Sequence, residues 1–184
     1  MKTHAQALSV RGQRYWVVDS SFEAATDEFL LILQYWRVAP GDVVFDVGAG
    51  IGEYVLPACA LGGKVYAFEP DPYSYTILES NLTLNGYDAQ CVVIPKALWS
   101  KGGLMSIAEM PLSLALPTGH PLHKATIPAT TIDDYVQANG ISRLDWLKMD
   151  IEGGELEVLK GGVRVISQFK PSILVERHDM HPHL

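Results

Sequence analysis

The sequence has few of the features that secreted, membrane-spanning or nucleic-acid-binding proteins need. Among 184 residues there are only 2 cysteines, and Cys59 and Cys91 form no C-x-x-C pair, so we expect buried free thiols. No apolar run is long enough to span a membrane, and the first residues contain no signal-peptide core. The net charge is −7 and no basic run is present. We therefore expect a cytoplasmic protein without membrane or nucleic-acid partners.

The composition is that of one globular domain, with 48% hydrophobic and 19% charged residues. Short apolar runs predict strands at residues 43–47, 64–68, 90–94, 144–149 and 172–175. Helical spacing and end signals predict helices at 22–37, 53–61, 73–84, 130–138 and 155–167. The alternation predicts a parallel sheet covered on both faces, preceded by an N-terminal segment (1–40) and formed within residues 41–184. Residues 95–128, rich in Gly, Pro and Ser, are expected to be the least regular part.

A glycine-rich turn follows the first predicted strand, reading Asp46-Val47-Gly48-Ala49-Gly50-Ile51-Gly52. Glycines at such a turn allow the backbone to approach a ligand closely. Glu69 ends the next predicted strand, where a carboxylate can accept two hydrogen bonds from ribose hydroxyls. Because ligands bind beyond the carboxyl ends of parallel strands, these residues predict an adenosine-containing cofactor.

The spacing of the glycines favours S-adenosylmethionine over a nicotinamide dinucleotide. A dinucleotide fingerprint is G-x-G-x-x-G, whereas this loop is G-x-G-x-G. The preceding acid, Asp46, attracts the cationic groups of S-adenosylmethionine and repels a pyrophosphate. A nicotinamide-dependent oxidoreductase is therefore an alternative that the glycine spacing disfavours.

At this level of detail the sequence resembles the FkbM family of class I S-adenosylmethionine-dependent methyltransferases. The resemblance runs from about Val43 to Glu176. It includes the segments FDVGAGIG (45–52), VYAFEPDP (65–72), KAL (96–98), TIDD (131–134), LKMDIEGGE (147–155), LKG (159–161) and ILVE (173–176).

The resemblance implies an α/β, Rossmann-like three-layer sandwich with a mostly parallel sheet. Class I methyltransferases normally end in a hairpin of strands 6 and 7, but this sequence stops at Leu184, eight residues past Glu176. We therefore expect a sheet without that hairpin, with its fifth strand left as an exposed edge. Either the sequence is a fragment, or this edge is covered by a second copy of the chain, forming a homodimer, or by the N-terminal segment.

The resemblance also implies roles in cofactor binding. The Gly48–Gly52 loop would hold the methionine part, and Glu69 the ribose. Where the family often has an acid after the Ala-Leu pair, this sequence has Ser100, so a serine hydroxyl or a backbone carbonyl is expected to contact the adenine. The expected cofactor-binding residues are Asp46, Gly48, Ala49, Gly50, Gly52, Tyr54, Glu69, Pro70, Asp71, Ala97, Leu98, Ser100 and Asp150. Tyr54 and Trp99 are interpreted equally well as core aromatics.

Two acids follow the fourth predicted strand and suit methyl transfer to a hydroxyl. We expect Asp150 near the methyl donor and acceptor, and Glu152 or His178 as general base. Glu152 could instead cap the next helix. Lys148, inside an apolar strand, is expected to pair with an acid such as Glu176. The histidine-rich segment 178–183 is not expected to hold a metal, since histidine is a poor magnesium ligand.

Together these features predict an S-adenosylmethionine-dependent methyltransferase acting on a hydroxyl oxygen of a small molecule, sugar or secondary metabolite. The preference for oxygen comes from the family resemblance. A binding domain of the same fold that does not catalyse is a second interpretation.

Overall fold

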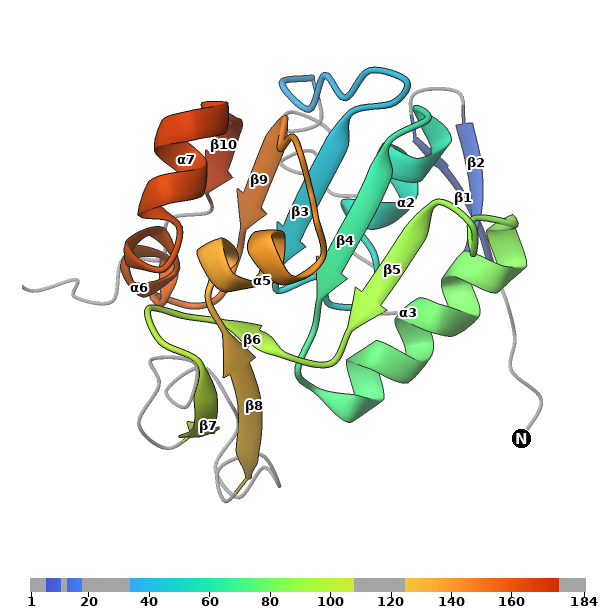
Figure 1. The fold of residues 1–184 in the computed structure, drawn as a ribbon. Coiled ribbons are helices and arrows are strands. Elements are labelled where there is room, and N and C mark those ends of the chain that lie inside the picture. Colours follow the sequence, from blue (N-terminus) through green and yellow to red (C-terminus); the bar gives the residue numbers. More distant parts are fainter. Residues whose placement is uncertain (1–5, 11–12, 18–33, 108–124, 176–184) are drawn as a thin grey trace, which may run out of the picture.

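A five-stranded parallel sheet forms the centre of the molecule, with strand order β10-β9-β3-β4-β5 (Figure 1). The computed structural model describes residues 6–10, 13–17, 34–107 and 125–175. The strands are β3 (Val43–Val47), β4 (Lys64–Phe68), β5 (Cys91–Ile94), β9 (Trp146–Met149) and β10 (Ser172–Val175). These five parallel strands confirm the prediction. Successive strands run outward from β3 in both directions, so the topological switch point lies between β3 and β9.

The helices lie between the strands along the chain. They are α2 (Val55–Ala60), α3 (Pro72–Asn85), α5 (Ile132–Ala138), α6 (Glu155–Lys160) and α7 (Val163–Phe169). The N-cap of α5 is Thr131, one residue later than predicted, and its side chain accepts a hydrogen bond from the backbone N–H of Asp134. Of the predicted helix at 22–37, residues 22–33 lie outside the described residues, and the described residues 34–37 form a turn and an irregular segment rather than a helix.

The prediction of a single helix over 155–167 was wrong, because the chain forms two helices interrupted at Gly161 and Gly162. A Cβ on Gly161 would lie 2.1 Å from the backbone oxygen of Trp99. Glycine is therefore required where the helix passes this segment, and glycine in turn favours the break.

Alternation of side chains along the strands produces two cores. On β3, Val44 points to one face, whereas Phe45 and Val47 point to the other. The first core contains buried residues of α2 and α3, and the second contains buried residues of α5, α6 and α7. The protein is thus the predicted three-layer sandwich.

Two smaller sheets were not predicted. An antiparallel hairpin, β1 (Gln6–Val10) and β2 (Gln13–Val17), is joined to the end of α3 by two hydrogen bonds between the Asn85 amide and the backbone of Trp16. Within 95–128, which we expected to be irregular, the chain forms β6 (Ala97–Leu98), β7 (Gly103–Ser106) and the start of β8 (Thr126–Thr130). These three strands make a sheet of order β6-β8-β7, which lies beyond the carboxyl ends of the main strands (Figure 1).

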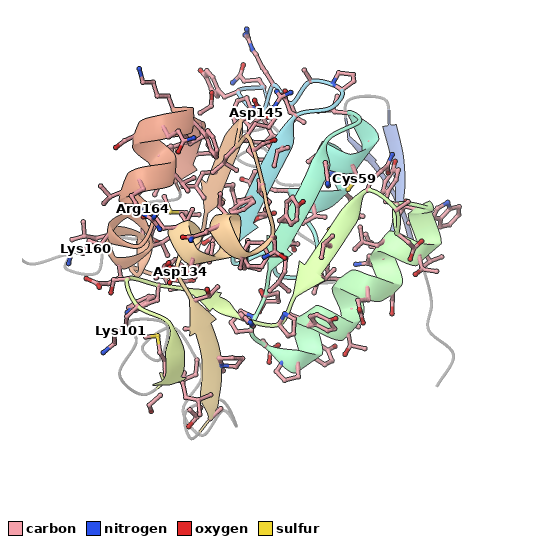
Figure 2. The ribbon with its side chains drawn as sticks, viewed as in Figure 1. Cys59, Lys101, Asp134, Asp145, Lys160 and Arg164 are labelled. Carbon is pink, nitrogen blue, oxygen red and sulfur yellow. The ribbon has the colours of Figure 1, made fainter. Side chains whose placement is uncertain are left out.

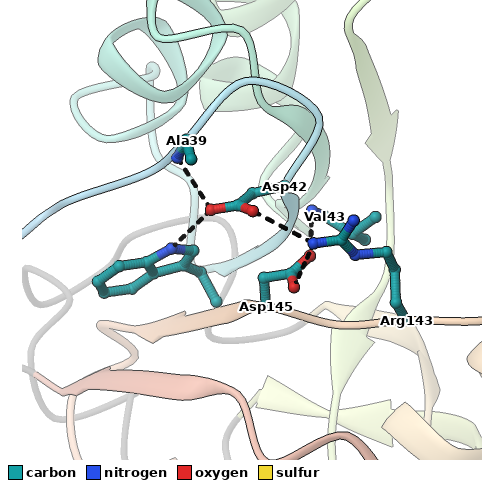
Figure 3. Close-up of polar contacts among 6 residues, drawn as sticks. Ala39, Asp42, Val43, Arg143 and Asp145 are labelled. Carbon is teal, nitrogen blue, oxygen red and sulfur yellow. Dashed lines mark hydrogen bonds and ion pairs between the residues drawn. The ribbon is translucent and has the colours of Figure 1, made fainter.

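At the opposite, amino-terminal end of the main sheet, a small network joins β3 to β9 (Figure 3). The guanidinium of Arg143 contacts Asp42 at 3.3 Å and Asp145 at 2.6 Å. Asp145 also accepts a hydrogen bond from the backbone N–H of Val43, and Asp42 accepts one from the indole of Trp146. These groups fix where the two strands begin.

Cys59 on α2 (Figure 2) and Cys91 on β5 are buried and free, as the sequence predicts. A hydrogen bond with Cys59, together with burial, raises the pKa of the Cys91 thiol. Among the described helices, none combines the length and the apolar character needed to cross a membrane.

Candidate cofactor and active site

The turn after β3 packs directly against the turn after β9. Gly48, Gly50 and Gly52 have φ angles of 74°, 54° and 111°, in the region that favours glycine. A Cβ on Gly48 would lie 2.0 Å from the backbone oxygen of Asp150, and one on Gly52 would lie 2.9 Å from Cδ1 of Leu78. The glycines therefore allow the backbone of Asp150 and the side chain of Leu78 to pack against this loop more closely than any residue with a Cβ at these positions would permit.

Glu69, at the carboxyl end of β4, holds this loop. Its Oε2 accepts a hydrogen bond from the backbone N–H of Gly50 at 2.8 Å, and its Oε1 accepts one from that of Asp71 at 2.8 Å. Only 7% of Glu69 is exposed, and burial raises its pKa to about 7 in spite of both hydrogen bonds. Asp71 in turn caps α3 by accepting from the backbone N–H of Ser74.

Lys148 links the two turns from inside the sheet. It lies opposite Asp46 in the register of β9 and β3. Its Nζ is 3.1 Å from Oδ1 of Asp46 and 3.8 Å from Oδ2 of Asp150, it donates to the backbone oxygen of Gly48, and it lies over the ring of Tyr54. Burial alone lowers the pKa of Lys148, but the two carboxylates outweigh it and raise that pKa above its usual value, so the ammonium stays charged.

Glu53 is a further carboxyl group at the glycine loop, and the sequence reasoning missed it. It follows Gly52 directly, and its Oε2 lies 3.2 Å from the position that a Cβ on Gly50 would take. Burial raises its pKa to about 7, while the charge of Lys148 acts in the opposite direction. Neither the spacing of the glycines nor the helical pattern signals that this carboxylate turns toward the loop.

The turn after β9 carries the predicted catalytic acids. The side chain of Asp150 is 31% exposed. Glu152 has a φ of 55°, which is unusual for a residue other than glycine. The backbone N–H groups of Ile151 and Gly153 donate to Oε1 of Glu155, so a carboxylate from the first turn of α6 holds this loop.

The Ala-Leu pair lies on β6, as a buried strand paired with β8. Ser100 donates a hydrogen bond to Oε2 of Glu157, and its predicted adenine contact stays a prediction. Trp99 is buried against Gly154 and Gly161, which agrees with its interpretation as a core aromatic.

The structure thus brings together the predicted residues from three strand ends, namely Asp46 with the glycine loop, Glu69, and Asp150. The Ala-Leu pair lies on β6, in the sheet beyond the carboxyl ends of the main strands (Figure 1). His178 and Glu176 lie outside the described residues. Within the ranges that the structure covers, no three His, Cys, Asp or Glu side chains are grouped as a metal site would require.

A glycine loop after the first strand of a parallel sheet, an acid ending the second and an acid following the fourth define a class I methyltransferase-like fold. The profile of the Methyltransferase FkbM domain matches residues 46–184, which begins at the acid of the glycine loop and includes every strand from β4 onward. The chain belongs to the FkbM methyltransferase family.

Two curated relatives are similar over most of this chain. The hexuronic acid methyltransferase AglP of Haloferax volcanii is 32% identical over 145 residues, covering 74% of this chain and 56% of the relative. The 31-O-demethyl-FK506 methyltransferase FkbM of Streptomyces tacrolimicus is 32% identical over 158 residues, covering 68% of this chain and 61% of the relative. The chain therefore spans little more than half the length of these proteins.

A solved structure has the same fold. The methyltransferase FkbM of Methylobacillus flagellatus superposes with a TM-score of 0.57 at 24% identity, covering 76% of this chain and 33% of the other. The similarity supports the arrangement of strands and helices described above.

Proposed function

We propose that this chain is an S-adenosylmethionine-dependent methyltransferase that acts on a hydroxyl oxygen of a small molecule, sugar or secondary metabolite. The family match across the complete glycine loop and both acidic turns carries the proposal. The names of the two curated relatives support it, since one is a hexuronic acid methyltransferase and the other a 31-O-demethyl-FK506 methyltransferase.

The residues at the strand ends suit S-adenosylmethionine. Each carboxylate oxygen of Glu69 accepts one backbone N–H and retains a second acceptor site, which suits it to the vicinal hydroxyls of a ribose. Asp46 and Asp150 place negative charge around the glycine loop, where a cationic amino-acid moiety would be stabilised.

The same loop is a poor site for a pyrophosphate. The backbone N–H groups of Gly48 and Ala49 donate to the oxygen of Phe68, and that of Gly52 donates to Ala49. The N–H of Gly50 donates to Glu69. Since a dinucleotide site relies on such N–H groups to bind phosphate oxygens, this observation supports S-adenosylmethionine over a nicotinamide cofactor.

The cofactor would supply a methyl group already activated on a sulfonium sulfur. The chain would position the acceptor and remove its proton. Asp150 is our candidate for orienting the acceptor hydroxyl, and Glu152 or His178 for accepting its proton. The strained backbone of Glu152 supports a functional role, because left-handed conformations of such residues concentrate at functional sites.

Calorimetry with S-adenosylmethionine, S-adenosylhomocysteine and NAD tests the cofactor. Binding of NAD without binding of either adenosyl ligand would overturn the proposal. Methyl transfer is then measured by mass spectrometry with uronic acids, other sugars and hydroxylated secondary metabolites. Asp150→Asn, assayed at saturating cofactor because the loss of its charge also weakens cofactor binding, is expected to lose about 10²–10³-fold in turnover. Cofactor binding without transfer to any acceptor would favour a non-catalytic binding domain.

We also propose a cytoplasmic location and a homodimer that covers β10. This strand is the edge of the main sheet among the described residues, and it exposes Ile173 and Val175. A sedimentation mass of one chain at micromolar concentration would contradict the dimer.

A further inference from the structure

The ionisable groups near the two turns are three carboxyl groups and one ammonium, and burial raises the pKa of two of the carboxyl groups, those of Asp46 and Glu53. Asp46, Glu53 and Asp150 contribute carboxyl groups, and Lys148 contributes the ammonium that interacts with each of them. Oδ2 of Asp46 is buried and accepts no hydrogen bond from the described part of the chain. Because uncompensated charge is costly away from water, a cation in this space would be stabilised by the protein.

Glu53 is the member of this group that reaches the glycine loop. Gly50 lies between two carboxyl groups: Glu69 binds its N–H at 2.8 Å, and Oε2 of Glu53 lies 3.2 Å from its Cβ position. The proposed function places the methionine part of the cofactor on this loop. A charge on Glu53 would therefore be felt by that part of the ligand.

The two forms of the cofactor differ in charge. S-adenosylmethionine carries a sulfonium cation, and S-adenosylhomocysteine, its product, carries a neutral thioether in the same position. We propose that Glu53 is a specificity-determining residue whose carboxylate makes this site favour the sulfonium form over the thioether product. This inference rests on the proposed function.

The charged surroundings of Glu53 set its response to pH. Asp46 on β3 and Asp150 after β9 repel its negative charge, and Lys148 on β9 attracts it; Glu69 and Asp71 lie on the other side of Gly50. With a pKa of about 7, which burial raises, Glu53 is mostly protonated below neutral pH and mostly ionised above it. The preference for the cation should accordingly grow as the pH rises through 7.

The test measures dissociation constants of both ligands by calorimetry at about pH 6 and about pH 8. For the full wild-type chain, the preference for S-adenosylmethionine should increase about tenfold between these values. In Glu53→Gln the increase should disappear, with S-adenosylmethionine binding about tenfold weaker at the higher pH and S-adenosylhomocysteine little changed. Glu79→Gln, on the exposed face of α3, alters the net charge equally and should behave as wild type.

Two further probes separate charge from folding. Glu53→Asp retains a carboxylate and should restore the pH-dependent preference, which keeps the test valid if Glu53→Gln is unstable. Sinefungin carries an ammonium near the position of the sulfonium. Its affinity should therefore depend on pH and on Glu53 in the same way as the affinity of S-adenosylmethionine.

If Glu53→Gln weakens both ligands by the same factor, or retains the pH-dependent preference, Glu53 has only a structural role and the inference is overturned. If the wild-type chain binds neither ligand, the proposed function fails together with it.

Discussion

The two ends of strands β3 and β9 carry similar charged groups in different surroundings. At the amino-terminal end, Asp42 and Asp145 share Arg143, whose side chain is 55% exposed. At the carboxyl-terminal end, Asp46 and Asp150 share Lys148, whose side chain is 5% exposed. Both are pairs of carboxylates around one cation, so composition alone does not distinguish them.

Burial makes the difference between the two ends. Water screens the charges around Arg143, and one nitrogen of its guanidinium, Nη2, contacts both acids, so this group requires no further partner. Around Lys148 the ammonium and the carboxyl group of Asp46 are desolvated, so under the proposed function the charge of a ligand would have a large effect there. The amino-terminal network joins two strands, and the carboxyl-terminal group is suited to respond to a ligand.

Removal of the two cations gives the largest expected difference. Lys148→Met leaves Asp46 buried without its counter-ion and should lower the free energy of unfolding by about 3–5 kcal/mol. Arg143→Met should have a far smaller effect, because its partners remain hydrated. Urea denaturation measures the free energy of unfolding of both variants. Similar decreases in the two variants would mean that burial is not what distinguishes the two ends of the strands.

Glycine substitutions extend the comparison to the backbone. Gly41, before β3, has a φ of 86° and nothing within 4 Å of its Cβ position, whereas that of Gly48 lies 2.0 Å from the backbone of Asp150. Gly41→Ala should cost about 1 kcal/mol for its left-handed conformation alone. Gly48→Ala should cost about 2–4 kcal/mol, because the turn after β9 has to move. If thermal denaturation shows the same decrease in stability for Gly41→Ala and Gly48→Ala, this close packing is contradicted.

The two ends should also respond to pH with opposite signs. Glu53 and Glu69, near the carboxyl end, have pKa values raised from 4.5 to about 7 by burial. The folded protein therefore binds more protons than the unfolded chain between these values, and stability falls as the pH rises through this range. We expect a loss of about 2 kcal/mol between about pH 5 and about pH 8 without cofactor.

The amino-terminal end provides the control for this pH dependence. Burial of Asp145 acts to raise its pKa, but hydrogen bonds from Arg143 and from the backbone of Val43 outweigh it and lower the pKa below 3.8. The stability that Asp145 contributes is therefore fully present at neutral pH. It is lost only as the pH falls below the pKa that Asp145 has in the unfolded chain. Glu69→Gln should flatten the stability profile between about pH 5 and about pH 8, and Asp145→Asn should not. A wild-type profile that rises across this range would refute the assignment.

The smallest expected effect concerns Glu152. Its φ of 55° destabilises the folded protein by about 1 kcal/mol. Glycine removes this strain, but it makes the unfolded chain more flexible and so lowers stability by a similar amount. Glu152→Gly should therefore change stability by less than about 0.5 kcal/mol while slowing methyl transfer about 10²-fold or more. Unchanged turnover would remove Glu152 as the base; since the N-cap of α6 is Gly154 and no side chain caps it, only the charge of Glu152 near the helix N-terminus would then remain as its role.

Most of the main sheet could be predicted from the sequence because its strands are local patterns. The run Val43–Val47 is apolar apart from Asp46, ends in a glycine turn and needs no distant partner to be identified. The two-residue strand β6 has no such pattern and exists only through its pairing with β8, about thirty residues further along the chain.

Positions in the site were predictable where a strand end fixes them. Glu69 and Asp150 follow strands directly, so their shared edge of the sheet follows from parallel topology. The partner of Lys148 depends on the register between β3 and β9, and only the structure places Asp46 opposite it. Glu53 was missed because its orientation depends on packing between α2 and the sheet.

The glycine at position 48 has a consequence for how such fingerprints are used in classifying proteins. The space that a side chain would need there is occupied by the protein's own Asp150 backbone, so this glycine records contact between two turns. A search pattern built on Gly48 alone selects for this contact between the turns after β3 and β9, whereas the spacing of the later glycines adds a separate signal that favours S-adenosylmethionine over a dinucleotide. Under the proposed function, the carboxyl groups around the junction would select the cofactor, and a pattern meant to separate cofactor classes would gain from including positions such as 53 and 69.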